Sequence, residues 1–207
     1  MALIEISRAE RLAFGGAAAL IALQALPAAS WLEYRRELLA AEPWRILTGH
    51  FVHLNWPHAL VNAAAWCIVA RLFAPELGVR GQLTSMVAAC VGIAAGLAWL
   101  HPQIAWYRGF SGVLHALFFA GASRAALDAM QARAGWRGLW LPLALLAGAA
   151  IKVGIEQPGD ASTPFANWLG APVVPQAHLL GAVIGCSVGL ATSMIRSAPA
   201  QTRDERQ

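Results

Sequence analysis

Charged residues are scarce in this sequence. They make up 13% of the 207 residues, whereas soluble domains carry about 25%, so the chain has too little polar surface to cover a globule of its size. Lysine is almost missing, since Lys152 is the only one. The same scarcity excludes an intrinsically disordered chain and a charge-rich coiled coil.

Cysteine is rare as well. The three cysteines, Cys67, Cys90 and Cys186, lie in apolar runs and show no CxxC spacing. This pattern excludes a disulfide-rich secreted module, and it is typical of small packing residues rather than of metal or redox sites. The sequence also has no evident internal repeat, which is unlike a transporter built from duplicated halves.

Apolar residues dominate the chain instead. They account for 58% of it, and the mean hydropathy is +0.53. A helix needs roughly 20 apolar residues to cross about 30 Å of hydrocarbon. We therefore predict an all-α membrane protein, with one six-span domain over 1–196 and a disordered cytoplasmic tail over 197–207. The predicted helices are 12–30, 57–73, 82–100, 111–127, 138–155 and 176–195.

The positions of the basic residues predict the orientation. Ten of the fifteen Lys and Arg residues fall in segments on the side of the N-terminus, and five fall in the others. The positive-inside rule then places both termini in the cytoplasm. These anchors also explain the net charge of +4, so nucleic-acid binding is not expected. The first apolar run follows Arg8 and Arg11 and is interpreted as a span, with a cleavable signal peptide as the alternative.

The segment 31–56, between the first two predicted spans, is unusually long. It contains Trp, His, Arg and Glu residues but is apolar over 46–54. A free loop would be more polar, so we expect this segment to lie partly in the outer membrane interface.

A serine flanked by glycines opens the fourth predicted helix, in Gly109-Phe110-Ser111-Gly112. Glycine permits tight backbone turns, and the N–H groups at a helix start favour developing negative charge. With Arg124 at the inner interface, Ser111 would lie roughly 10 Å below the outer surface of the hydrocarbon. A hydroxyl at that depth must be buried in protein or reached by water. The sequence thus indicates a candidate nucleophile.

A histidine lies near the outer end of the sixth predicted helix, at a depth similar to that of Ser111. Gly181, Gly185 and Gly189 follow His178 on or near the same face, and such glycines let another helix approach closely. His178 is therefore the candidate base. The alternative is that it makes a local hydrogen bond and that the glycines only pack.

Further polar residues lie on the second predicted helix. His58 and Asn62 are four residues apart and share one face, where they could hold an oxyanion. A metal site is the alternative, because His50 and His53 precede them. No carboxylate lies inside a predicted span and no HExxH pattern is present, so neither a metal nor another cofactor is expected.

Taken together, these motifs resemble the rhomboid intramembrane serine proteases over 12–195. The resemblance rests on Trp44 and Arg45, His53, His58 to Asn62, Gly109 to Gly112, and Ala177-His178 with Gly181 and Gly185. The segments 42–58, 109–115 and 173–178 look more narrowly like the rhombosortase branch. The resemblance implies a six-helix rhomboid-like bundle.

The resemblance also implies roles for the residues. Ser111 would be the nucleophile and His178 the general base, in a dyad with no Asp or Glu as a third member. His58 and Asn62 would form the oxyanion hole together with the Ser111 N–H group. The supporting residues would be Gly109, Gly112, Gly181 and His115.

Three further residues are expected near the site. Many rhomboids carry a tyrosine that stacks on the catalytic histidine, and His115 stands there in this chain. We expect its ring to stack in the same way. Lys152 and Glu156, four residues apart near the outer end of the fifth helix, are expected to pair at the interface, with a substrate contact as the alternative.

The implied function is that of a serine endopeptidase in the bacterial inner membrane, with its site opening to the periplasm. Its substrates would be transmembrane proteins ending in a Gly-Gly motif, an apolar helix and a basic tail, and lipid would surround it. Two other classes remain open: a catalytically inactive rhomboid-like protein that binds membrane clients, and a small-solute channel or transporter.

Overall fold

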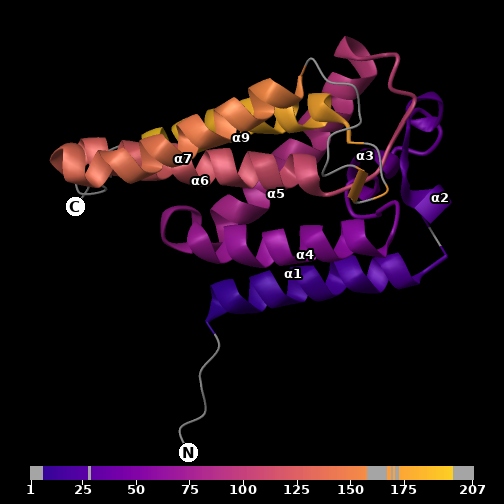
Figure 1. The fold of residues 1–207 in the computed structure, drawn as a ribbon, viewed down its shortest axis with the longest axis horizontal. Coiled ribbons are helices and arrows are strands. Elements are labelled where there is room, and N and C mark those ends of the chain that lie inside the picture. Colours follow the sequence, from indigo (N-terminus) through magenta and orange to yellow (C-terminus); the bar gives the residue numbers. More distant parts are fainter. Residues whose placement is uncertain (1–6, 28, 158–166, 169, 171–172, 198–207) are drawn as a thin grey trace, which may run out of the picture.

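The computed structural model describes residues 7–27, 29–157, 167–168, 170 and 173–197. This part of the chain is mostly helical (Figure 1). Its elements are α1 (Arg8–Ala25), α2 (Ala29–Leu32), β1 (Tyr34–Arg35), a 3₁₀ turn (Arg36–Leu38), α3 (Arg45–Thr48), α4 (Trp56–Leu72), α5 (Ala74–Leu100), β2 (Trp106–Tyr107), α6 (Ser111–Gln131), α7 (Gly135–Glu156) and α9 (Pro175–Ser197).

The first helix differs from the predicted range 12–30 at both ends. It begins at Arg8 because Ser7 and Glu10 form a capping box, in which each side chain accepts from the other's backbone N–H. It ends at Ala25 because the next residue, Leu26, precedes Pro27 and is extended. The expected end at residue 30 was therefore wrong.

The helix α5 begins eight residues before the predicted start at 82. A break at Gly78 divides it, with φ 58°, a value that only glycine adopts readily. The charged residues Glu76 and Arg80 on either side of the break interrupt the apolar run, although the backbone stays helical around them. Hydropathy therefore located the span but missed its first two turns.

The remaining long helices overlap their predicted ranges closely. The helix α4 begins at Trp56, where the Asn55 side chain accepts from the His58 N–H at 2.9 Å. The helices α6 and α9 each run past their predicted ends, and the tail over 198–207 lies outside the described residues.

The closest helix packing joins α6 to α9. A Cβ atom added at Gly181 would lie 2.1 Å from the Gly112 carbonyl oxygen, and one at Gly185 would lie 2.2 Å from that of Ala116. The glycines therefore let the two backbones touch, as small residues do in membrane helices. Because Gly181 follows His178 by one turn, this contact also sets the position of the histidine against α6.

The segment between α1 and α4 folds against the loop that precedes α6. Tyr34 pairs with Tyr107 in a two-residue antiparallel ladder of β1 with β2. Glu33 is 2% exposed and accepts from Arg35 at 2.7 Å and from Arg108 at 2.5 Å. This segment is thus an ordered part of the fold that braces the residues leading into Ser111.

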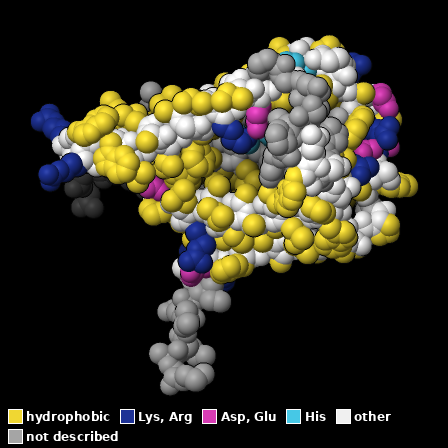
Figure 2. Space-filling view, in the orientation of Figure 1, with side chains coloured by type: hydrophobic (Ala, Val, Ile, Leu, Met, Phe, Trp, Pro, Cys, Tyr) yellow, Lys and Arg dark blue, Asp and Glu magenta, His cyan; other side chains and the backbone are white. Residues whose placement is uncertain are grey.

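The outer surface of the helices is apolar. Figure 2 shows hydrophobic side chains along the length of the bundle on this face, with Lys and Arg mostly toward its ends. Among the described helices, α5, with 27 residues, and α7, with 22, are long and apolar enough to cross a membrane. The helix α7 is little covered by the rest of the protein, with Pro142 and Val153 as its buried residues.

Candidate active site

Ser111 is the first residue of α6 and follows a constrained turn. Gly109 has φ 130°, and a Cβ atom there would lie 2.9 Å from Cε1 of His58. Glycine is therefore required at this position both by the backbone and by the neighbouring ring. The turn places the Ser111 loop directly against the first turn of α4.

The structure joins Ser111 to His178. His178 lies in the first turn of α9 and is 5% exposed. Its Nε2 atom is 2.9 Å from Ser111 Oγ. This is the distance at which an imidazole can take the proton from a serine hydroxyl.

A carboxylate completes the other side of the histidine. Glu156, the last residue of α7, places Oε2 2.8 Å from His178 Nδ1. The expectation of a dyad without an acidic partner was therefore wrong for the geometry of this site. Glu156 was missed as a partner of His178 because its spacing from Lys152 explains it locally, and no sequence signal fixes the rotation of α7 relative to α9.

Lys152 and His115 close the site into a ring of hydrogen bonds. Lys152 Nζ lies 2.7 Å from Glu156 Oε1 and 3.2 Å from His115 Nε2. His115 Nδ1 lies 2.8 Å from the Ser111 carbonyl oxygen. The expected pairing of Lys152 with Glu156 is thus present, and it is directed into the site rather than only along the interface.

The two imidazole rings stack. The ring centroids of His115 and His178 are 4.2 Å apart, and the planes are inclined by 18°. Stacking restricts rotation of the His178 ring about its side-chain bonds and shields one of its faces. His115 therefore has the contact that was expected of it in place of a tyrosine.

The candidate oxyanion residues lie on α4, and both are buried. His58 is 9% and Asn62 is 3% exposed. Asn62 donates one amide N–H to the His58 carbonyl oxygen at 3.0 Å, and its amide carries a second. The His58 ring is brought beside Gly109, whereas Asn62 lies one turn deeper along the helix.

Two more histidines lie buried in the segment before α4. His50 Nε2 contacts the Cys90 carbonyl oxygen at 3.0 Å, and the His53 ring meets His58 edge-on with centroids 5.0 Å apart. Burial lowers the pKa of His50 to about 4, and burial with the neighbouring His58 lowers the pKa of His53 to about 3. Both rings are therefore neutral at physiological pH.

These two pKa values predict loss of stability in acid. The unfolded chain takes up protons on both histidines below about pH 6.5, whereas the folded chain does so only near pH 4 and 3. The free energy of unfolding therefore falls as the pH drops through this window. We expect the melting midpoint in detergent to fall by about 5 °C or more between pH 7 and pH 5.

A His53→Gln variant provides the comparison, because it removes one of the two titrating rings. Its melting midpoint should depend less on pH than that of the wild type over the same range. A wild-type midpoint that does not change from pH 7 to pH 5 would contradict the burial of these neutral imidazoles.

One cluster has the composition of a metal site. Ligand atoms of His115, Glu156 and His178 lie within 4.8 Å of one another. The Lys152 ammonium, however, contacts both His115 Nε2 and Glu156 Oε1. The His115 and His178 rings are also stacked on each other. The contacts therefore favour a hydrogen-bonded network over a metal centre.

Comparison with known proteins identifies one family. The model described as the Rhomboid domain matches residues 40–195. This range contains all the site residues described above, from His50 to His178, and leaves out α1. No curated protein matches the chain.

Proposed function

This chain belongs to the rhomboid family of multi-span helical membrane proteins, which are typically intramembrane serine proteases, and we propose that it is a serine endopeptidase acting within the membrane. The observation that carries the proposal is the 2.9 Å contact between Ser111 Oγ and His178 Nε2. A serine and a histidine at this distance, both at helix starts in an apolar protein, have the arrangement that acyl transfer needs.

The proposed reaction has two steps. Ser111 Oγ attacks the scissile carbonyl carbon while His178 Nε2 takes the hydroxyl proton, which it then gives to the leaving amine. Water next attacks the acyl-enzyme, with His178 again acting as base, and frees the carboxylate product. The Ser111 N–H group, His58 and Asn62 are proposed to hold the oxyanion in both steps.

We further propose that six helices span the bacterial inner membrane with both termini in the cytoplasm. Ser111 begins α6, His178 lies at the start of α9 and Glu156 ends α7, so these elements bring the site to one end of the bundle. The excess of basic residues at the opposite end supports placing the site toward the periplasm.

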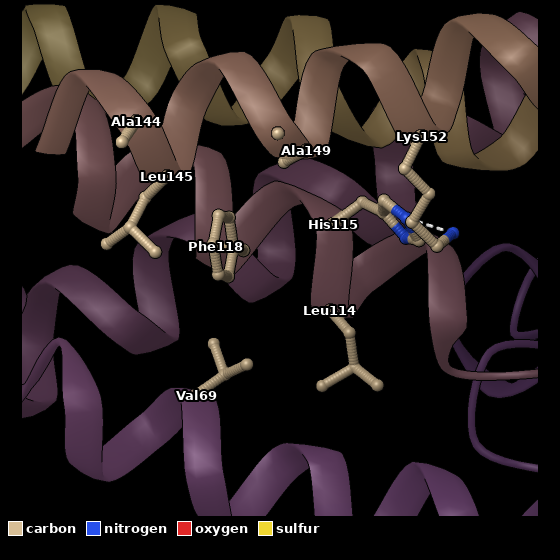
Figure 3. Close-up of a pocket in the computed structure, with 9 residues that line it drawn as sticks. Val69, Leu114, His115, Phe118, Ala144, Leu145, Ala149 and Lys152 are labelled. Carbon is tan, nitrogen blue, oxygen red and sulfur yellow. Dashed lines mark hydrogen bonds between the residues drawn. The ribbon is translucent and has the colours of Figure 1, made fainter. Parts of the chain in front are cut away.

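An apolar groove adjoins the site and supports a membrane-embedded substrate. It lies between α4, α6 and α7, has a volume of about 430 Å³, and includes His115 and Lys152 (Figure 3). Its other lining residues include Val69, Leu114, Phe118 and Leu145. An apolar segment of a substrate would fit this groove, with its polar end close to the serine.

The proposed substrates are membrane-anchored proteins with a C-terminal Gly-Gly motif, an apolar helix and a basic tail, as the resemblance to rhombosortases implies. A protease must bind an extended backbone, because the hydrogen bonds of a helix hide the scissile amide. Glycines weaken a helix by about 1 kcal/mol each. A Gly-Gly site therefore presents the backbone in an accessible form.

Covalent labelling tests the proposed nucleophile. In a fluorophosphonate reaction, the Ser111 oxygen displaces fluoride from phosphorus and its proton passes to His178. We expect the purified full chain to be labelled at Ser111 and the Ser111→Ala variant to remain unlabelled. Ser187→Ala is a matched control on α9, where the exposed hydroxyl donates to the Val183 carbonyl oxygen, and it should label normally.

Labelling also tests the alternative of an inactive protein. A catalytically inactive client-binding protein would leave Ser111 unlabelled although the chain is folded. Peptide mapping of the adduct distinguishes labelling at Ser111 from labelling at any other serine.

A further inference from the structure

The helix α7 contributes two charges to a site whose serine and histidine come from α6 and α9. Glu156 is 17% exposed at its side chain and Lys152 is 53% exposed. Lys152 is the only lysine in the chain, and its ammonium group lies beside the His115 ring (Figure 3). The carboxylate therefore contacts His178 directly, and the ammonium contacts the carboxylate.

The charges determine the direction of every hydrogen bond in the ring. A carboxylate only accepts, so His178 Nδ1 must carry the hydrogen that it donates to Glu156, and His178 Nε2 is left to accept from the Ser111 hydroxyl. An ammonium only donates, so His115 Nε2 must accept from Lys152. His115 Nδ1 then donates to the Ser111 carbonyl oxygen.

These hydrogen-bond directions determine which nitrogen of His178 can act as the base. Glu156 holds His178 in the tautomer whose free lone pair faces the nucleophile, and its negative charge stabilises the imidazolium that forms during attack. Lys152 holds the second oxygen of the same carboxylate and orients His115, which stacks on His178. The lysine also balances a carboxylate that would be costly to leave alone in this setting.

We propose that Glu156 and Lys152 are a pair of positioning residues with opposing electrostatic effects on His178. The site then acts as a Ser–His–Glu triad, in which the positive charge of Lys152 partly offsets the stabilisation of the His178 imidazolium by Glu156. This inference rests on the proposed protease function. Among the described residues, the charged and titratable groups that face His178 are Glu156 and Lys152 from α7, His115 from α6 and His58 from α4.

The test measures how the second-order rate constant for fluorophosphonate labelling of Ser111 depends on pH, from pH 5 to pH 10, in the purified full chain. The rate rises with pH as His178 loses its proton, and this rise forms the acid limb of the profile. Glu156→Gln should lower the plateau by about 10²-fold or more. It should also move the acid limb about one pH unit toward acid.

Lys152→Met should move the acid limb in the other direction, about one unit toward alkaline pH, because it removes a positive charge that opposes the imidazolium. Lys152→Arg keeps the charge and should restore the wild-type position of the limb. A merely structural role for the two residues would lower labelling without displacing the limb in opposite directions.

Two exposed charges serve as matched controls. Glu37 is 62% exposed and lies 3.8 Å from Arg35, so Glu37→Gln should leave the profile unchanged. Arg137 is exposed on α7 at the end away from Glu156, so Arg137→Met should also leave it unchanged. Melting midpoints measured alongside show whether each variant is folded.

Different results would contradict the positioning pair and the protease function. Acid limbs that stay in place, or that move in the same direction in Glu156→Gln and Lys152→Met, overturn the positioning pair while Ser111 still labels. If Glu156→Gln does not fold, the comparison of Lys152→Met with Lys152→Arg decides by itself. A folded wild type that never labels overturns the protease function instead.

Discussion

Replacing Ser111 or His178 with alanine is expected to abolish cleavage of a membrane-anchored reporter in cells. The reporter carries a Gly-Gly motif, an apolar helix and a basic tail, and its released fragment is measured by immunoblotting. Each variant removes one partner of the 2.9 Å contact, and we expect a loss of at least about 10³-fold, because a serine and its base act as one unit. The double variant should lose no more than either single one.

The control for this experiment is Ser187→Ala, which removes a hydroxyl on the same helix as His178 but outside the site. It should cleave at the wild-type rate. Equal amounts of each variant in the membrane fraction exclude a loss of protein as the cause. Undiminished cleavage in either Ser111→Ala or His178→Ala would show that the reaction does not use this pair.

The serine and the histidine could be predicted because each is unusual in its surroundings. A glycine-flanked serine at a helix start, or a histidine ahead of a row of glycines, stands out in a chain with 13% charged residues. Both positions depend on local sequence and on a periodicity that a single helix displays. The geometry between them depends on packing, which the glycines of α9 only indicate.

The contact of Glu156 with His178 could not be predicted from the sequence. Successive residues of a helix are turned by about 100°, so a small error in the orientation of α7 would direct this carboxylate toward lipid or water instead of His178. Its i, i+4 neighbour Lys152 offered a sufficient local partner. The sequence therefore predicted the ion pair and not its neighbour on α9.

The contacts of the segment between α1 and α4 could not be predicted from the sequence either. Its strand β1 has two residues and pairs with a strand more than seventy positions away. Periodicity cannot reveal so short an element. Buried Glu33 could not be paired with Arg108 in advance, because the contact depends on how the segment between α1 and α4 meets the loop that precedes α6.

The second large effect concerns the contact between α6 and α9. Gly185→Val is expected to destabilise the fold by about 3 kcal/mol or more, because its Cβ atom would lie 2.2 Å from the Ala116 carbonyl oxygen and 2.8 Å from Ala116 Cα. Neither backbone atom can move aside without separating the helices. Thermal unfolding of the purified protein in detergent measures the effect, which should lower the melting midpoint by about 6 °C or more.

Gly15→Ala is the matched control, since a Cβ atom at this position in α1 meets nothing within 4 Å. Alanine has the higher helix propensity, so its midpoint should be equal to or above that of the wild type. The same variants link the fold to the site, because His178 reaches Ser111 only if α9 lies close to α6. Gly185→Val should therefore lose fluorophosphonate labelling at temperatures where it is still folded, and normal labelling with an unchanged midpoint would contradict the backbone contact proposed to hold the catalytic pair together.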